Sequence, residues 1–150
     1  MRVVVQRVKW ANVKISGELF SQIGEGLLVL LGITHDDSTL DVEWLTKKVS
    51  QLRIFDDKDG VMNLSVKEIN GDVMVVSQFT LFAKTAKGNR PAYINAAPHD
   101  IAIPLYNEFV EKMQVAIGKK VATGKFGEYM KIELLNDGPV TIMIDSKNRE

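Results

Sequence analysis

Three polar side chains follow directly on a hydrophobic run near the middle of the chain. Residues 73–76 are apolar and mostly β-branched, which predicts a strand buried on both faces. Ser77, Gln78 and Thr80 come immediately after this run. A polar side chain buried without a partner costs roughly 1–3 kcal/mol. The strand therefore ends either in a satisfied polar network or at a site, and this stretch alone leaves both interpretations open.

The segment after that strand indicates what such a site would bind. Residues 83–90, here called the basic loop, carry Lys84, Lys87 and Arg90 and no acidic residue. A polar strand end beside positive charge suits an anionic ligand, and a phosphate contact is the hypothesis that charge alone supports. A solvated lysine-rich loop explains the same residues equally well.

A second polar stretch lies near the C-terminus, where residues 136–141 read Asn-Asp-Gly-Pro-Val-Thr. Its Asn, Gly and Pro residues are those of an ordinary hairpin loop. Residue spacing alone therefore supports no more than a soluble domain with a candidate site that faces an anion.

Other catalytic and metal-binding patterns are absent or incomplete. His35 and His99 both fall in predicted turns beside capping residues, which favours surface or capping roles. Residues 56–60 lack the spaced ligands of a calcium loop. In residues 123–127 a Gly-Lys pair is followed by Phe, whereas a phosphate loop requires Ser or Thr. Without cysteine or a histidine cluster, we expect neither a metal nor another cofactor.

The overall composition is that of an ordinary globular protein. The chain has 150 residues, of which 45% are hydrophobic and 25% charged, with 19 Lys+Arg against 19 Asp+Glu. Any contact with nucleic acid must therefore come from local clusters of charge. The longest apolar run, residues 27–33, is far shorter than the ~20 residues of a membrane helix, and the N-terminus turns polar too early for a signal peptide. We expect one soluble, cytoplasmic domain over residues 1–150.

Hydrophobic periodicity predicts strands, a helix, further strands, a second helix and two final strands. The expected strands are residues 2–8, 12–15, 20–23, 27–31, a run that opens at 73, 130–135 and 140–145. A capping box at residues 38–41 starts the first helix, which runs to about Gln51; the second helix starts near His99 and ends at Gly118. Strands and helices do not alternate strictly, which favours an α/β (α+β) fold with helices on a largely antiparallel or mixed sheet. The polar tail, residues 146–150, is expected to fray.

The two polar stretches together resemble a known family. Ser-Gln-Phe-Thr-Leu at 77–81 and Asn-Asp-Gly-Pro-Val-Thr at 136–141 are similar to the paired signature motifs of the D-aminoacyl-tRNA deacylases. The similarity continues, in order, at residues 6–8, 24–27, 53–56, 62–64, 88–91 and 123–127. The departures lie outside the signature motifs: Val61 where lysine is common, Ala92-Tyr93 where Ser-Phe is usual, and a short extension at residues 148–150.

The resemblance implies a barrel-like core with two main helices packed on it, and an enzyme that hydrolyses the ester between a D-amino acid and the terminal adenosine of tRNA. Glycine mischarged on tRNA would also be a substrate. The protomers would pair as a homodimer, in which Gly138-Pro139 adopts a cis bond and enters the partner's active site. Ser77, Gln78, Phe79 and Thr80 would form the wall that receives the substrate.

An aminoacyl ester is a reactive acyl donor, so positioning and an oxyanion-binding pair of backbone N–H groups could suffice for its hydrolysis. We assign that pair to Phe79 and Thr80, with the RNA's 2′-hydroxyl helping to orient the attacking water. Thr80 as a covalent nucleophile ranks second, because no base lies near it in sequence. A backbone carbonyl of Gly138 or Pro139 at the substrate's α-carbon would collide with an L side chain. The rival functions are a non-catalytic nucleic-acid-binding module and an esterase for small acyl substrates.

Overall fold

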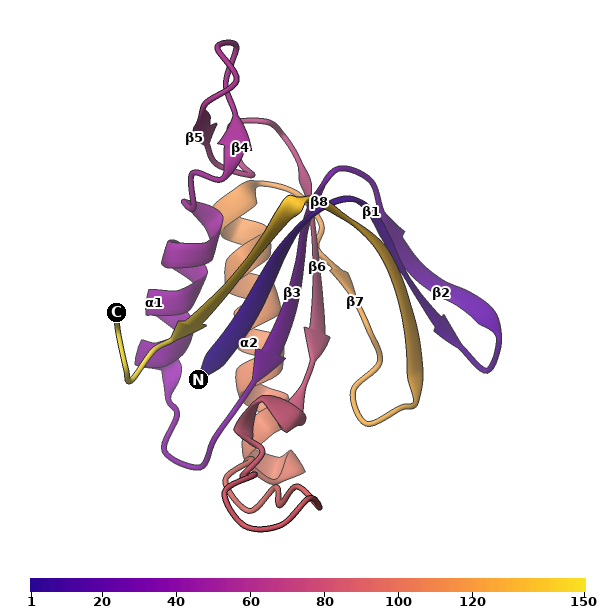
Figure 1. Cartoon of the computed structure of the whole chain (residues 1–150), viewed down its shortest axis with the longest axis vertical. Helices are drawn as coiled ribbons and strands as arrows, with labels where there is room; N and C mark the ends of the chain where they lie inside the picture. Colours follow the sequence, from indigo (N-terminus) through magenta and orange to yellow (C-terminus); the bar gives the residue numbers. More distant parts are fainter.

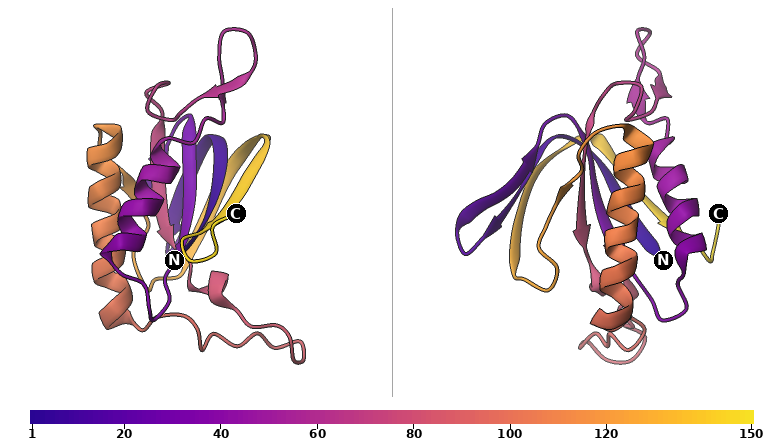
Figure 2. Two further views of the ribbon diagram at one scale, coloured as in Figure 1. Left: turned by 90° about the vertical axis from the view of Figure 1, so that its left-hand side faces the viewer. Right: turned by 180° about the vertical axis from the view of Figure 1, so that it is seen from behind.

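Two helices lie side by side against one face of a curled, mixed β-sheet (Figures 1 and 2). The computed structural model describes all residues, 1–150. The elements in chain order are β1 (Arg2–Ile15), β2 (Glu18–Ile23), β3 (Gly26–Gly32), α1 (Thr39–Ser50), β4 (Phe55–Asp56), β5 (Met62–Leu64), β6 (Asp72–Ser77), the 3-10 turn η1 (Phe79–Phe82), α2 (His99–Ile117), β7 (Ala122–Thr123) and β8 (Met130–Asp145). No helix is both long and apolar enough to cross a membrane.

The sheet curls because the long strand β1 has different neighbours along its length. On one side its first half pairs with β3 and its second half with β2, while β8 follows it along the other side. β3, β6 and β7 are parallel, and the other pairs in the sheet are antiparallel. The hydroxyl of Ser21 in β2 donates to the carbonyl of Thr123 in β7 at 2.6 Å, which links two distant strands. The sheet is thus mixed and nearly closed into a barrel, as predicted.

The central strands β3 and β6 are buried on both faces, which explains their continuous apolar sequences. Residues that alternate along them enter two different cores. Leu27, Val29 and Val75 pack with the helices in the larger core. Leu28 and Met74 point to the other side, into a smaller core inside the curl of the sheet. Because β6 is held on both faces, its polar end is fixed in place.

The predicted helix boundaries are confirmed. α1 begins at the capping box, where the backbone N–H of Ser38 donates to Asp41 at 2.9 Å. α2 runs from His99 and ends before Gly118, which has a φ of 73° in the left-handed region that glycine adopts readily.

The structure corrects the loop predicted between two final strands. β8 does not stop at residue 135 and restart at 140, but continues as one strand along β1. Gln6 lies opposite Thr141 and Val8 opposite Asn136, so residues 137–140 bulge opposite a single residue of β1. The sequence suggested a loop because Asn, Gly and Pro are typical of turns; pairing with the long β1 overrides that preference.

The C-terminal tail was expected to fray, and this prediction is wrong for its first residues. Ser146 is buried, and its hydroxyl donates to Asp41 at 2.7 Å and accepts from the ammonium group of Met1 at 3.0 Å. Lys147 also reaches Asp41, with its Nζ 3.0 Å from Oδ2. These polar contacts hold the tail, and nothing in a polar sequence distinguishes them from solvated ends.

The same contacts predict a pH dependence of stability. Burial opposes ionisation of Asp41, but hydrogen bonds from Ser146, Lys147 and Ser38 outweigh it and lower the pKa of its carboxyl from 3.8 to about 2. A carboxyl whose pKa is lower in the folded state stabilises the protein above the unfolded pKa, and this stabilisation is lost as the pH falls toward the folded pKa. Between pH 5 and pH 2, the free energy of unfolding should therefore fall by about 2 kcal/mol more in the wild type than in Asp41→Asn.

Urea denaturation at a series of pH values measures this difference. Lys147→Ala should remove only part of the pH dependence, since Lys147 is one of several donors to Asp41. Equal pH slopes for the wild type and Asp41→Asn would contradict the assignment.

Candidate active site

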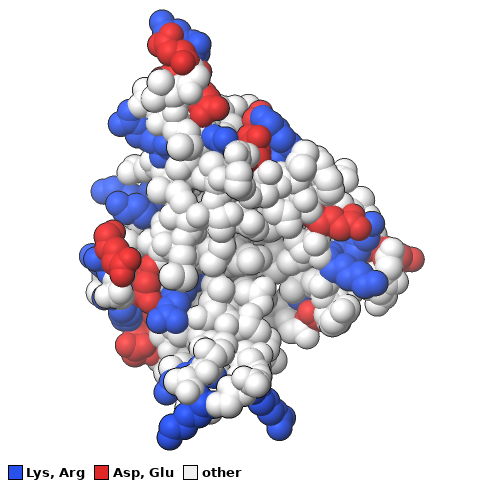
Figure 3. Space-filling model, in the orientation of Figure 1, with Lys and Arg blue, Asp and Glu red and all other residues white.

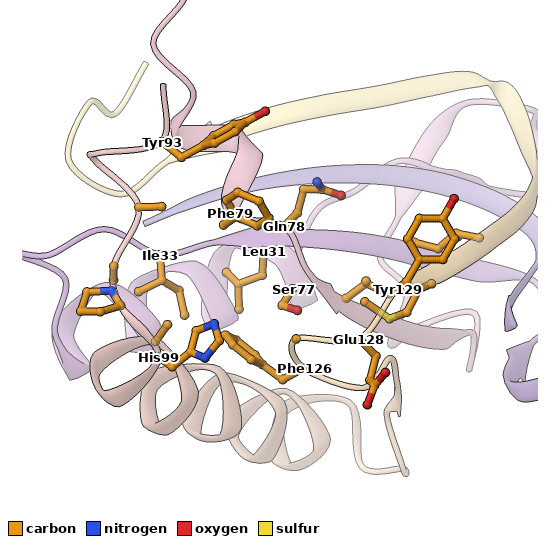
Figure 4. A pocket seen from close by; sticks show the side chains of 18 residues that line it. Leu31, Ile33, Ser77, Gln78, Phe79, Tyr93, His99, Phe126, Glu128 and Tyr129 are labelled. Atoms are coloured by element: carbon orange, nitrogen blue, oxygen red, sulfur yellow. The ribbon is translucent and has the colours of Figure 1, made fainter. Parts of the chain in front are cut away.

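A pocket of about 540 Å³ opens where the buried strands β3 and β6 end (Figure 4). Besides Leu31 and Ile33 at the end of β3, its walls come from three segments that are distant in sequence. One is the end of β6 with the start of η1, the second is the start of α2 with the residues before it, and the third is the stretch leading into β8. Twelve of its 18 lining residues are hydrophobic, so the few polar groups in the pocket stand out against an apolar surface.

The end of β6 delivers the predicted polar residues to this pocket. Ser77 pairs with Leu31 in the last position of the β3–β6 ladder, and the backbone N–H of Gln78 donates to the Leu31 carbonyl at 2.8 Å. The chain then leaves the sheet and enters η1. Ser77, Gln78 and Phe79 all line the pocket, whereas Thr80 is not among its lining residues.

Thr80 is held by its neighbour. The side-chain amide of Gln78 donates a hydrogen bond to the Thr80 hydroxyl. An amide is not a base, and no carboxylate, histidine or lysine is hydrogen-bonded to this hydroxyl. The arrangement fixes the two side chains relative to each other and supplies Thr80 with no group that could activate it as a nucleophile.

The backbone at the start of η1 offers hydrogen-bond donors. The first N–H groups of a helical turn have no acceptor within the turn. The N–H of Leu81 is used by the Gln78 carbonyl at 3.3 Å. Those of Phe79 and Thr80 precede it at the beginning of the turn, and Phe79 lines the pocket.

Aromatic rings frame the pocket (Figure 4). Phe79 and Tyr93 meet edge to face, with ring centroids 4.9 Å apart. On the opposite wall the rings of His99 and Phe126 are perpendicular, with centroids 5.4 Å apart. Phe126 also packs on Tyr106, whose hydroxyl donates to the Val75 carbonyl at 2.8 Å. Burial raises the pKa of Tyr106, so this phenol stays a hydrogen-bond donor. The pocket is thus suited to a flat ring.

His99 was predicted to have a surface or capping role, yet it also lines the pocket. Its partner Phe126 lies more than twenty residues further along the chain, so no local pattern could have indicated this contact. No group of three or more His, Asp or Glu side chains gathers anywhere in a way that could hold a metal ion.

Gly138 and Pro139 lie away from this pocket. They belong to the β8 bulge, residues 137–140, and are exposed and joined by a cis peptide bond. Figure 1 shows the bend of β8 at the upper edge of the sheet and η1 at the lower end. The structure therefore does not bring the two signature motifs together within one protomer.

A buried arginine holds the β8 bulge in place, a feature that sequence reasoning missed. Arg7 is only 7% exposed. Its guanidinium donates to the carbonyls of Asp137 at 3.2 Å and Ile54 at 2.6 Å, and it forms ion pairs with the carboxylates of Asp56 at 3.5 Å and Asp137 at 3.3 Å. The signal was the alternation in the predicted strand, where Arg7 follows Val3 and Val5 on the buried side.

Gly138 leaves little room for any other residue. Its φ is +124°, and a Cβ atom there would lie 2.8 Å from Val140 Cγ2 and 3.1 Å from Arg7 Nη2. The bulge is therefore held by the Arg7 guanidinium and tightly packed around Gly138.

The basic loop projects beside the pocket at the lower tip of the molecule. Lys84 and Ala92 are joined by two backbone hydrogen bonds of 2.8 and 3.0 Å, which bring the two ends of the loop together. Lys84, Lys87 and Arg90 are exposed, and none has a carboxylate partner within 4 Å. Figure 3 shows Lys and Arg side chains at this tip without neighbouring acids.

Comparison with known proteins gives a consistent result. A family model described as D-Tyr-tRNA(Tyr) deacylase matches residues 4–145. A D-aminoacyl-tRNA deacylase of Parabacteroides distasonis is 61% identical over 150 residues, which is the whole of both chains. A protein of the same name from Flavobacterium psychrophilum is 57% identical over the same extent.

Two solved structures share the fold. The c-Myc DNA unwinding element binding protein has a TM-score of 0.92 and 40% identity, with 97% of this chain and 98% of that chain covered. A probable eukaryotic D-amino acid tRNA deacylase has a TM-score of 0.78 at 21% identity, with 95% and 97% covered. The resemblance read from the two signature motifs is confirmed: this chain belongs to the D-Tyr-tRNA(Tyr) deacylase family of hydrolases.

Proposed function

We propose that this protein hydrolyses the ester bond of D-aminoacyl-tRNA and releases the free D-amino acid and tRNA. The family assignment supports this reaction, and the pocket at the polar end of β6 supports the location of the active site. The apolar, aromatic walls suit the adenine ring of the tRNA 3′ end, while Ser77 and Gln78 offer polar groups near the ester. Because the substrate is a tRNA, the cytoplasm is the compartment that we propose.

The chemistry needs no covalent intermediate. Water adds to the ester carbonyl carbon, with its proton accepted through the neighbouring 2′-hydroxyl of the ribose. The resulting oxyanion accepts hydrogen bonds from the N–H groups of Phe79 and Thr80. The bond to the ribose oxygen then breaks, and that oxygen takes a proton. One oxyanion donor of this kind can contribute about 3 kcal/mol to the stability of the transition state.

Thr80→Ala separates this mechanism from one with a threonine nucleophile. The variant keeps the backbone N–H, so the rate of D-tyrosyl-tRNA hydrolysis should stay within about tenfold of wild type. Loss of a covalent nucleophile should lower it by about 10³-fold or more. Single-turnover kinetics measures the chemical step, and Thr80→Ser serves as the control that keeps the hydroxyl. If the hydrolysis rate falls 10³-fold in Thr80→Ala and is restored in Thr80→Ser, Thr80 acts as a covalent nucleophile.

We further propose that the protein acts as a homodimer and that Gly138-Pro139 of one protomer completes the partner's pocket. The single observation that carries this proposal is the position of the two motifs at opposite ends of the sheet within one protomer. β8 also pairs only with β1, so its other edge is free, and Met143 on this strand is 73% exposed. A long unpaired edge with apolar side chains is a surface that proteins usually cover.

In such a dimer the bulge would act as a chirality filter. A backbone carbonyl of Gly138 or Pro139, held against the substrate's α-carbon, collides with an L side chain and leaves a D side chain free to point outward. Glycine has no side chain to reject, so glycyl-tRNA should also be hydrolysed. A filter of backbone atoms must be rigid, and the contacts of Arg7 with the bulge supply rigidity.

The decisive experiment compares ester loss from D-tyrosyl-, glycyl- and L-tyrosyl-tRNA. We expect the first two to be hydrolysed and the third to be spared. Equal hydrolysis of D- and L-tyrosyl-tRNA, or of neither, would refute the proposal.

We assign the basic loop to the phosphates of the tRNA acceptor stem. Lys84→Glu together with Lys87→Glu should raise the dissociation constant for tRNA and make it less dependent on salt, because fewer counterions are released on binding. Nitrocellulose filter binding over a range of salt concentrations measures both effects. The matched control reverses two other exposed lysines without a carboxylate partner within 4 Å, Lys58 and Lys120. If both double variants behave alike, the loop is only a solvated surface.

A non-catalytic nucleic-acid-binding module is the second candidate. One solved relative, 40% identical, is named for binding a DNA unwinding element. This function predicts binding of tRNA or DNA without turnover, which the same ester assay distinguishes. An esterase for small acyl substrates would instead cleave free aminoacyl esters without the RNA.

A further inference from the structure

A second group of unpaired positive charges lies at the other end of the molecule from the basic loop. A shallow hollow at the C-terminal end of α1, here called the α1 hollow, is lined by Trp44, Lys47, Lys48, Gln51, Leu52 and Arg53. Half of these residues are cationic and none is acidic. In Figure 3 blue side chains gather at the upper left of the molecule, on the side that carries α1.

The charges of the α1 hollow are not used inside the protein. Lys47, Lys48 and Arg53 are exposed, and no carboxylate oxygen lies within 4 Å of their nitrogens, whereas Lys119 has Asp72 at 2.6 Å. Arg53 uses its Nε to donate to the Asn63 carbonyl at 2.8 Å, and its two terminal nitrogens remain available to a ligand. Lys47 and Lys48 lie in the last turn of α1, where positive charge stabilises the helix dipole. This effect alone would explain the two lysines without any ligand.

That structural explanation does not extend to the cations that reach the same place from other segments. Arg53 follows the helix, and Arg149 comes from the C-terminal tail. The guanidinium of Arg149 stacks on the Trp44 ring with its carbon 4.4 Å from the centroid, and Lys48 Nζ lies 5.7 Å from the same centroid. Two cations on one ring, with Lys47 and Arg53 in the lining of the same hollow, repel each other unless an anion lies among them.

The α1 hollow is tied to the β8 bulge through two short links. Arg53 is followed directly by Ile54, whose carbonyl accepts from the Arg7 guanidinium at 2.6 Å. The same guanidinium donates to the carbonyl of Asp137, the first residue of the bulge, at 3.2 Å. The hollow therefore keeps a fixed place relative to Gly138, far from the pocket and the basic loop of its own protomer.

We propose that the α1 hollow binds the phosphodiester backbone of the tRNA whose 3′ end occupies the partner's pocket. This inference rests on the proposed function: where the bulge of one protomer enters the other's pocket, the α1 hollow comes with it. Each active site is then flanked by positive charge from both chains. The basic loop comes from the protomer that owns the pocket, and the α1 hollow comes from the protomer that lends the bulge.

The chemistry of the hollow fits a phosphate backbone rather than a particular base. The Arg53 fork can bind two phosphate oxygens at once, and the lysines act as point charges. Such contacts position an RNA without reading its sequence. They suit an enzyme whose filter reads the α-carbon and accepts many D-amino acids.

The test compares Lys47→Ala/Lys48→Ala with Lys14→Ala/Lys120→Ala, which removes the same charge outside both basic groups. Dissociation constants for uncharged tRNA are measured with the full-length protein over a range of salt concentrations. In the hollow variant, affinity at 0.1 M salt should fall about tenfold or more, and the slope of log K against log salt should lose about 2 units. KM for D-tyrosyl-tRNA should rise in parallel. The control variant should match the wild type.

A spectroscopic readout places tRNA at the hollow itself. In a Trp10→Phe variant Trp44 is the only tryptophan, and tRNA binding should change its emission saturably, at the same concentration as in the binding assay. Equal affinities and slopes for the two double variants, or a silent Trp44, would overturn the inference. Hydrolysis of D-tyrosyl-tRNA by the wild type tests the proposed function separately. A wild type that cleaves D-tyrosyl-tRNA while the hollow variant binds tRNA normally would refute the α1 hollow as a tRNA-binding site. It would leave the proposed hydrolysis standing.

Discussion

Mixing two inactive variants should restore about one quarter of the wild-type activity per protomer. Gly138→Ala disables the bulge, because a Cβ atom would lie 2.8 Å from Val140 Cγ2 and 3.1 Å from Arg7 Nη2, in a backbone conformation that L residues rarely adopt. Gln78→Glu disables the pocket while conserving size, because it places a negative charge next to the developing oxyanion. Each homodimer alone should lose about 10²-fold or more in activity toward D-tyrosyl-tRNA.

Random reassociation makes about half of the dimers mixed. In a mixed dimer the chain with Gly138→Ala still has an intact pocket, and it receives an intact bulge from its partner, so one of the two sites works. The experiment dissociates and reassociates the two variants in equal amounts and follows ester loss. A bulge that served the pocket of its own chain would leave the mixture as inactive as its components, and that result would refute the cross-subunit arrangement.

Arg7→Ala should be the most disruptive single substitution outside the pocket. The guanidinium is buried and gives hydrogen bonds to two carbonyls that belong to the bulge and to the segment before β4. Its removal leaves those carbonyls without their donor and the partly buried Asp137 carboxylate with only Lys9, at 3.4 Å. We expect the free energy of unfolding to fall by about 2–4 kcal/mol and D-tyrosyl-tRNA hydrolysis to fall at least as steeply as in Gly138→Ala.

Two controls separate positioning from stability. Arg7→Lys keeps the charge but cannot reach all the acceptors of the guanidinium fork, so it should restore stability more fully than activity. Lys112→Ala removes partly exposed pairs with Glu43 and Glu108 and should change the unfolding free energy by only about 0.5–1 kcal/mol. Chemical denaturation and single-turnover kinetics provide the two measurements. Wild-type activity in Arg7→Ala would show that Arg7 is not needed to position the β8 bulge for the chirality filter.

The sequence predicted those parts of the fold that depend on local patterns. The buried β6 strand with its polar end, the capping box at Ser38 and the glycine that ends α2 are all confirmed. Each is encoded by residues within a few positions of one another. The paired signature motifs likewise identified the family, and three of the four predicted wall residues line the pocket.

What the sequence could not show are contacts between distant segments. The β8 bulge depends on the length of β1, the order of the tail depends on Asp41, and His99 reaches the pocket through Phe126. Turn-forming and polar residues indicated a loop and a frayed end, because local preference is all that a short window contains. Arg7 is the clearest example, since its four partners come from two segments far along the chain.

Through β1 and β3, the bulge of β8 lies level with the start of β6, whereas the other signature motif begins where β6 ends. If catalysis needs both, a solitary protomer possesses two halves of a catalytic centre that it has no means of joining. Turnover per chain would then decline on dilution as soon as the copies separate. A newly synthesised molecule would remain inert toward the ester until it encountered a second one.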